Sequence, residues 1–227
     1  MTLGLSTLAG EHNRPTNVAS GEWELVPPHE QNVCQRVASA TNGWVTPGNV
    51  ISGIGAALTI TGLLKYEKGD RTIGTALVGI GRVLDVVDGK VAKISGTRGN
   101  IGAVLDAGLD KYTTGSAAIA LADTVITKQD AIIMGALQAS IVQSSREIDA
   151  HGGAPDPSAV GKLAMFSTWC WMGSKMVEGA ANQLGDYNTE KVFASIGKVS
   201  KVSAFALTAK NTYDYRQTAR QLRAETN

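Results

Sequence analysis

The stretch "DVVDGKVAKISGTRGNIGAVLDAGLD", residues 85–110, places four aspartates around a run of small and polar residues. Asp85 and Asp88 are three positions apart, and Asp106 and Asp110 are four apart, so each pair shares one face of a helix. The intervening "ISGTRGN" combines Gly, Ser, Thr and Asn, which is typical of a turn. The pattern predicts two helices that fold back on each other and bring the four carboxylates to a similar height.

Four carboxylates that face one another repel strongly unless a cation lies between them. Hard divalent cations such as Mg²⁺ and Mn²⁺ take oxygen ligands and commonly bridge carboxylates and substrate phosphates. The cluster therefore predicts metal-assisted phosphoryl transfer with two bound ions. The alternative is that the acids pair with basic neighbours such as Arg82 and Lys90 on solvated faces. That alternative suits one pair of aspartates better than it suits all four.

Outside this stretch the sequence predicts an all-α protein. Strand-like alternation is nearly absent, and short turn signals separate long helical segments. Segment 29–40 predicts a short amphipathic helix on a surface. The main helices are expected at about 48–66, 71–94, 99–126, 130–149, 158–184 and 190–222.

Composition leaves the environment of these helices open. The net charge is +1, so no basic field indicates nucleic acid as a partner. A mean hydropathy near zero is typical of a soluble protein. Residues 37–64, however, contain no charged side chain and are rich in the small residues that allow close helix packing in bilayers. The two cysteines predict no disulfide framework, and the first residues do not resemble a signal peptide.

The aspartate stretch also follows the pattern D-x2-D-G-x2-A-K-x8-G-x3-D-x3-D. This pattern resembles the signature of the CDP-alcohol phosphatidyltransferase family, which has Arg where this chain has Lys93. The six-helix layout extends the resemblance from about 46 to 215. It implies a bundle of six transmembrane helices, with a polar N-terminal segment over 1–45, a catalytic domain over 46–222 and a short tail over 223–227.

The resemblance also implies roles for individual residues. Asp110 is expected to be the general base that deprotonates the attacking hydroxyl, and Lys93 is expected to meet the nucleotide phosphate. Lys is a point charge without the bidentate fork of Arg, so this departure bears on nucleotide affinity. The Mg²⁺ or Mn²⁺ ligands are expected to be Asp85, Asp88, Asp106 and Asp110. The residues that make room for the cytidine nucleotide are expected to be Gly89, Ala92 and Gly102.

A second resemblance concerns the acceptor. "SSREIDAHGGAPDPSAVGKLAMFSTW", residues 144–169, is similar to a segment of phosphatidylglycerophosphate synthases in which an Arg-Glu pair precedes a Gly-Lys. Arg146 and Lys162 are therefore expected to bind the phosphate of glycerol 3-phosphate. Relatives of the phosphatidylinositol-phosphate type also place basic residues here, so an inositol phosphate acceptor is the alternative. Ordinary basic residues at a membrane boundary would give the same pattern.

Together these features predict a homodimeric membrane enzyme of phospholipid biosynthesis. It would move a phosphatidyl group from CDP-diacylglycerol to a polyol phosphate and release CMP. Lys90, Lys93 and Arg98 near the aspartates place the active site at the cytoplasmic face. Two other hypotheses remain at this stage. One is a soluble helical enzyme that clamps a diphosphate through metal ions, and the other is a catalytically silent membrane protein with a relic site.

Overall fold

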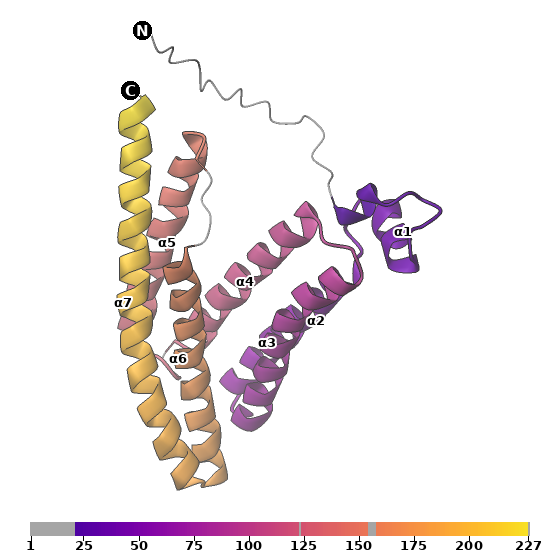
Figure 1. The fold of residues 1–227 in the computed structure, drawn as a ribbon. Helices are drawn as coiled ribbons and strands as arrows, with labels where there is room; N and C mark the ends of the chain where they lie inside the picture. Colours follow the sequence, from indigo (N-terminus) through magenta and orange to yellow (C-terminus); the bar gives the residue numbers. More distant parts are fainter. Residues whose placement is uncertain (1–20, 123, 154–157, 227) are drawn as a thin grey trace, which may run out of the picture.

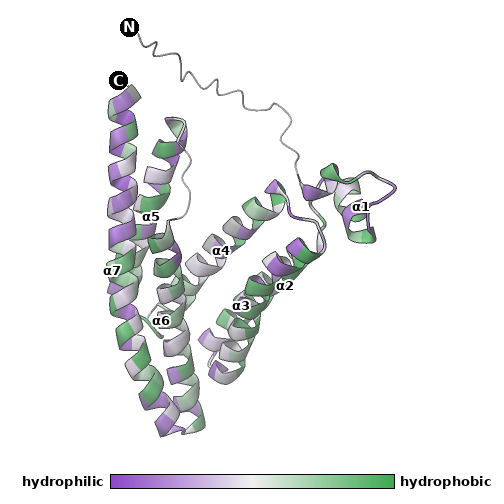
Figure 2. Ribbon diagram, in the orientation of Figure 1, coloured by the Kyte–Doolittle hydropathy of each residue, from purple (hydrophilic) through white to green (hydrophobic). Residues whose placement is uncertain are grey.

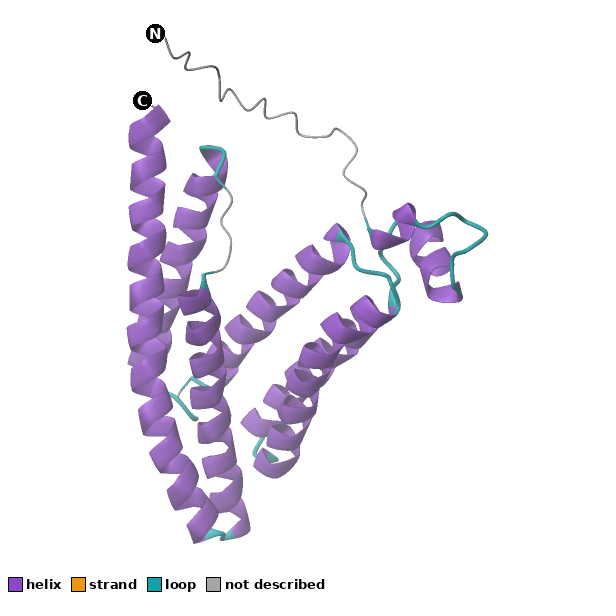
Figure 3. Cartoon of the chain, viewed as in Figure 1, coloured by secondary structure: helices purple, strands orange, loops and turns teal. Residues whose placement is uncertain are grey.

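The computed structural model describes residues 21–122, 124–153 and 158–226, and this part of the chain is almost entirely helical (Figures 1 and 3). Within it, β-structure is limited to two isolated bridges. Of the predicted polar segment 1–45, residues 1–20 lie outside the described residues. The elements are a 3₁₀ turn η1 (Glu22–Leu25) and the helices α1 (Val33–Ala40), α2 (Pro47–Glu67), α3 (Arg71–Ile94), α4 (Asn100–Ala120), α5 (Lys128–Ala150), α6 (Ala159–Leu184) and α7 (Tyr187–Thr226).

Local capping signals explain where the helices begin and end. The Thr46 side chain accepts a hydrogen bond from the Asn49 N–H, and Pro47 occupies the first helical position of α2. Gly185 ends α6 in the left-handed conformation, with φ of 72°. The short helix α1 lies inside segment 29–40, where the sequence predicts one. The last helix continues through residues 223–226, where the sequence predicts a separate tail.

The predicted helix over 99–126 is too long, because α4 ends at Ala120. The Leu121 carbonyl accepts hydrogen bonds from the N–H groups of Val125 and Ile126, both at 3.0 Å, which closes a local turn. The Thr127 side chain then accepts a bond from the Asp130 N–H and starts α5. Val125 and Ile126, which the prediction places in the helix, therefore belong to the connection that precedes α5.

Helices α2 and α3 pack with their backbones in close contact. A Cβ atom added at Gly62 would lie 2.7 Å from the Gly74 carbonyl oxygen, and one at Gly55 would lie 2.9 Å from the Gly81 oxygen. No larger side chain fits at these crossings without moving a helix. The same packing places Ser52 of α2 beside Asp88 of α3, which fixes one wall of the site.

Helices α5, α6 and α7 form a second group in which α7 packs against α5 and α6, and α3 contacts α6 between the two groups (Figure 1). Helix α4 packs mainly against α2. Large apolar side chains fill the interior of the second group. They include Leu121, Trp171, Met172 and Met176, all at most 3 % exposed. Burial of such side chains is the main favourable contribution to the packing.

Hydrophobic residues recur along the long helices (Figure 2), and some of them remain exposed. On α3, Ile80, Val83 and Val86 are more than half exposed, and on α7 so are Val199 and Val202. In the part of the chain that the structure describes, two helices are long and apolar enough to cross a membrane, namely α2 and most of α7. Exposed apolar faces of this kind are typical of a surface that contacts lipid or another protein.

Candidate functional site

The site forms where α3 turns into α4. Gly96 takes a left-handed conformation with φ of 64°, which few side chains tolerate. The Thr97 N–H donates to the Ala92 carbonyl oxygen at 2.9 Å, and the hydroxyls of Ser95 and Thr97 lie 2.7 Å apart. We call residues 95–99 the motif loop. It reverses the chain, so that the aspartates of α3 face those of α4, as the spacing predicts.

Three of the four predicted carboxylates converge. One oxygen of each of Asp85, Asp88 and Asp106 lies within 4.8 Å of the others. Asp88 is only 6 % exposed, and its carboxylate accepts hydrogen bonds from the Ser52 hydroxyl and from the Gly89 N–H. The three carboxylates offer hard oxygen ligands at a spacing that suits a divalent cation. This aspartate triad can bind a metal ion.

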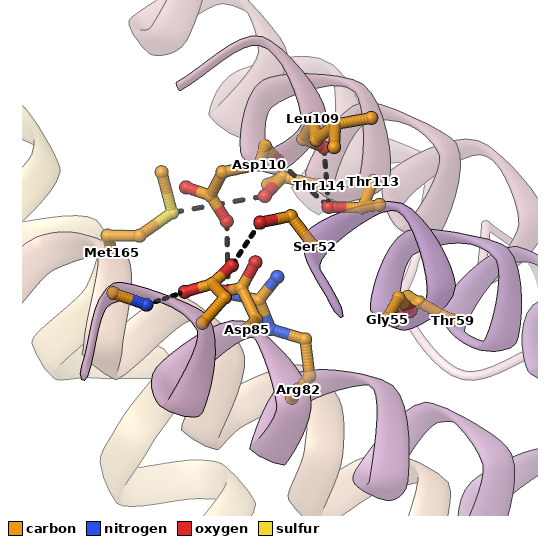
Figure 4. Close-up of polar contacts among 12 residues, drawn as sticks. Ser52, Gly55, Thr59, Arg82, Asp85, Leu109, Asp110, Thr113, Thr114 and Met165 are labelled. Atoms are coloured by element: carbon orange, nitrogen blue, oxygen red, sulfur yellow. Dashed lines mark hydrogen bonds and ion pairs between the residues drawn. The ribbon is translucent and has the colours of Figure 1, made fainter. Parts of the chain in front are cut away.

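The fourth aspartate, Asp110, lies beside the triad and pairs with Arg82. A single guanidinium nitrogen, Nη2 of Arg82, lies 2.9 Å from Asp85 Oδ2 and 3.0 Å from Asp110 Oδ1 (Figure 4). The centre of the guanidinium also lies 4.2 Å from the centroid of the Trp169 ring on α6. Pairing of the acids with a basic neighbour, the alternative that the sequence leaves open, is therefore present at Arg82. The spacing of three between Arg82 and Asp85 was the signal for it.

Two cavities meet at this cluster. The smaller has a volume of about 300 Å³ and lies between α2, α3, α4 and the motif loop. The larger has a volume of about 810 Å³ and lies between α3, α4 and α6. Asp88 lines the smaller cavity, Asp110 lines the larger one, and Asp106 lines both. A group bound in one cavity can therefore approach a group bound in the other beside Asp106.

The smaller cavity contains three of the four residues predicted to meet a nucleotide, namely Gly89, Ala92 and Gly102. A Cβ atom at Gly89 would meet nothing within 4 Å, so this glycine leaves space open, whereas one at Gly102 would lie 3.0 Å from Asn49 Oδ1. The fourth, Lys93, is exposed and does not line the cavity.

Arg98 of the motif loop is the cationic residue that lines the smaller cavity. From the sequence, Arg98 contributed only to the predicted orientation of the membrane helices, although its position between Gly96 and Gly99 was a signal that the loop could present it to a ligand. An arginine offers the bidentate fork that suits a phosphate group, and Lys93 does not.

The structure separates the two residues predicted to bind the acceptor phosphate. Lys162 of α6 lines the larger cavity together with Asp110 and Arg82. Arg146 of α5 is exposed and lines another cavity of about 470 Å³, beside Glu147 and His151. Only Lys162 of this pair therefore shares a cavity with the aspartates.

A comparison with protein families agrees with this arrangement. The model of the family described as CDP-alcohol phosphatidyltransferase matches residues 44–202. The chain belongs to the CDP-alcohol phosphatidyltransferase family. The match begins just before α2 and takes in the triad, Asp110 and both cavities. No curated protein and no solved structure gives a significant match.

Membership of the CDP-alcohol phosphatidyltransferase family supports an enzyme that transfers a substituted phosphate group from a CDP-alcohol donor to an alcohol acceptor. Proteins of this family are typically membrane-bound, which agrees with the two helices, among the described residues, that are both long and apolar enough to cross a bilayer. The triad is compatible with a divalent cation as cofactor.

Proposed function

We propose that the protein transfers a phosphatidyl group from CDP-diacylglycerol to a small polyol phosphate, with glycerol 3-phosphate as the favoured acceptor, and releases CMP. The observation that carries this proposal is that Asp106 lines two cavities of different character, with Asp88 on one side and Asp110 on the other. Two substrates must meet at one reacting phosphorus in such a transfer. A shared carboxylate between two binding spaces suits that requirement.

The smaller cavity takes the cytidine nucleotide in this proposal. Gly89, Ala92 and Gly102 supply the space, and Arg98 supplies a cation for the diphosphate. Lys93, the phosphate ligand that the sequence predicts, is exposed and would have to reach the nucleotide from outside the residues that line the cavity. The triad Asp85, Asp88 and Asp106 would hold Mg²⁺ or Mn²⁺, with two ions expected and Asp110 as the fourth carboxylate of the motif. A bound divalent cation would neutralise the diphosphate and the charge that develops on the leaving CMP.

The larger cavity takes the acceptor. Its hydroxyl oxygen forms a new bond to the phosphorus of the phosphatidyl group, the bond from that phosphorus to the CMP oxygen breaks, and the hydroxyl proton passes to Asp110. Arg82 engages Asp110 Oδ1 and thereby fixes the orientation of this carboxylate. Lys162 provides a positive charge for the acceptor phosphate. Arg146 is the second predicted phosphate ligand. Because it lines a separate cavity, it would have to bind the acceptor phosphate outside the larger cavity.

The proposal includes the environment of the enzyme. The six long helices α2 to α7 would cross the membrane, with residues 1–45 and 223–227 outside it, the active site at the cytoplasmic face and two chains forming a homodimer. Exposed apolar residues such as Ile80, Val83 and Val199 support contact with lipid. Extraction tests this part directly, since an integral membrane protein stays in the membrane at high salt and alkaline pH and is released by detergent.

The substrates are tested by CMP release from CDP-diacylglycerol in detergent micelles, with a panel of acceptors. Glycerol 3-phosphate is expected to give the highest kcat/KM and inositol phosphate is the second candidate. A preference of tenfold or more for inositol phosphate would change the acceptor and leave the donor reaction in place. Turnover only with a non-phosphorylated alcohol would overturn the assigned role of Lys162.

A further inference from the structure

The N-terminal segment before α2 contacts the motif loop at three points. The Glu22 N–H donates to the Arg98 carbonyl oxygen at 2.8 Å. The Asn32 side chain donates from Nδ2 to the Ser95 carbonyl oxygen at 3.3 Å, and the Gln35 side chain donates from Nε2 to the Gly96 carbonyl oxygen at 3.4 Å. These bonds join residues 61 to 76 positions apart in the sequence, so they hold the loop from outside α3 and α4.

The N-terminal segment is itself built to keep its shape. Trp23 is 2 % exposed, and the Gln31 side chain donates from Nε2 to its carbonyl oxygen at 2.8 Å. The cap of α1 is reciprocal, because the Asn32 side chain accepts from the Gln35 N–H while the Gln35 side chain accepts from the Asn32 N–H. Both side chains are therefore already oriented by the cap when they donate to the motif loop.

The loop that is held in this way forms one wall of the smaller cavity, through Thr97, Arg98 and Gly99. Its turn depends on Gly96, which adopts a left-handed conformation that glycine takes readily and few other residues tolerate. A Cβ atom at Gly96 would lie 2.6 Å from Gln35 Nε2, so the glutamine packs directly on this turn.

We propose that Gln35 is a positioning residue for the donor nucleotide, because it holds the motif loop in the conformation that presents Arg98 to the smaller cavity. The inference rests on the proposed function, in which that cavity takes the CDP group. It predicts that releasing the loop weakens binding of the donor and leaves the acceptor site unchanged, because Lys162 and Asp110 belong to the other cavity.

The chain offers a matched control at the α2–α3 turn. Gln183 donates from Nε2 to the Gly69 carbonyl oxygen at 3.1 Å, and it accepts from the Thr72 N–H at 3.3 Å. Gly69 also has a positive φ, of 99°. Gln35 and Gln183 therefore make the same kind of bond to a glycine turn, but only the Gln35 turn borders the smaller cavity.

The test compares Gln35→Ala, Gln35→Glu and Gln183→Ala in the full-length protein. Gln35→Ala is expected to raise the KM for CDP-diacylglycerol about fivefold, the factor that corresponds to one ordinary hydrogen bond, with the KM for the acceptor within twofold. Gln35→Glu retains the acceptor oxygen of the α1 cap and loses the donor to the loop, so it should not restore the wild-type KM. Gln183→Ala should leave both KM values unchanged.

Hydrogen exchange supplies a readout that needs no turnover. The Thr97 amide is expected to exchange about fivefold faster in Gln35→Ala and in Gln35→Glu than in the wild type or Gln183→Ala. Restoration of wild-type KM and exchange by Gln35→Glu would overturn the inference, since capping of α1 would then be the whole role of the side chain. Faster exchange without a higher donor KM would also overturn it. If the wild type released no CMP, the proposed function would fail, and exchange at Thr97 would still decide whether Gln35 holds the loop.

Discussion

The hydroxyl of Ser52 provides a quantitative test of how Asp88 is held. Ser52 is 6 % exposed and donates to the Asp88 carboxylate, and the same hydroxyl lies 3.1 Å from the Gly48 carbonyl oxygen one turn earlier in α2. Replacing Ser52 with Ala removes a donor from a buried carboxylate. A hydrogen bond to a charged group contributes about 1.5–3 kcal/mol, so the variant should lower the free energy of unfolding by about 2 kcal/mol.

Ser174 of α6 is the matched control. It is 5 % exposed, and its hydroxyl donates to the Cys170 carbonyl oxygen at 2.6 Å, again one turn earlier in its helix. Ser174→Ala removes the intrahelical bond without affecting a carboxylate, so it should cost less than about 1 kcal/mol. The difference between the two variants therefore measures the bond from Ser52 to Asp88.

Reversible unfolding in mixed micelles measures both variants, and a double-mutant cycle with Asp88→Ala, which removes the acceptor oxygen, isolates the pair. The cycle should give a coupling energy of about 1 kcal/mol or more between Ser52 and Asp88. Ser52→Ala should also raise the Mg²⁺ concentration needed for half-maximal turnover, because Asp88 loses its fixed orientation. Equal costs for Ser52→Ala and Ser174→Ala, with no coupling to Asp88, would refute the reasoning.

Three further predictions follow from the cavities and the helix packing. Arg98→Ala should raise the KM for CDP-diacylglycerol about tenfold and Lys93→Ala less than threefold, because Arg98 lines the smaller cavity and Lys93 does not. A larger rise for Lys93→Ala than for Arg98→Ala in a CMP-release assay would contradict this prediction. Lys162→Ala should raise the KM for glycerol 3-phosphate about tenfold and Arg146→Ala less than threefold, because only Lys162 of this pair shares a cavity with Asp110. Equal effects of the two variants would contradict this prediction and place both residues at the acceptor. Gly62→Ala should destabilise the protein by about 1–3 kcal/mol, because the added Cβ atom would lie 2.7 Å from the Gly74 carbonyl oxygen. An unchanged unfolding midpoint would show that α2 and α3 are packed less closely than this distance indicates.

Local signals were sufficient to predict most of the helices. Proline, threonine and glycine at helix ends act within a few residues, so the limits of α2, α3 and α6 follow from the sequence to within about two residues. The exceptions are α7, which extends beyond the predicted segment 190–222 at both ends, and α4. In α4, apolar residues continue past Ala120 and hide the turn that Thr127 ends. Periodicity cannot distinguish a longer helix from a buried turn when both are apolar.

At the site, too, local sequence signals predict some features, while others depend on tertiary packing. The spacing of Asp85, Asp88 and Asp106 predicts that they converge, because residues three apart share a helix face and the glycine turn reverses the chain. The bridge from Arg82 to Asp110 and the bond from Ser52 to Asp88 depend on tertiary packing across 28 and 36 positions. No local pattern encodes such contacts. Arg98 replaces Lys93 at the cavity wall for a similar reason, because the conformation of the motif loop decides which cation is presented.

The central claim is that the aspartate cluster catalyses transfer of a phosphatidyl group from CDP-diacylglycerol. The most direct measurement is CMP release by the purified wild-type protein and by Asp110→Asn, each with CDP-diacylglycerol, glycerol 3-phosphate and Mg²⁺ or Mn²⁺. The account predicts turnover by the wild type that stops when EDTA removes the metal, and a fall in kcat of at least a hundredfold in Asp110→Asn. Turnover that persists in Asp110→Asn or in EDTA would contradict it.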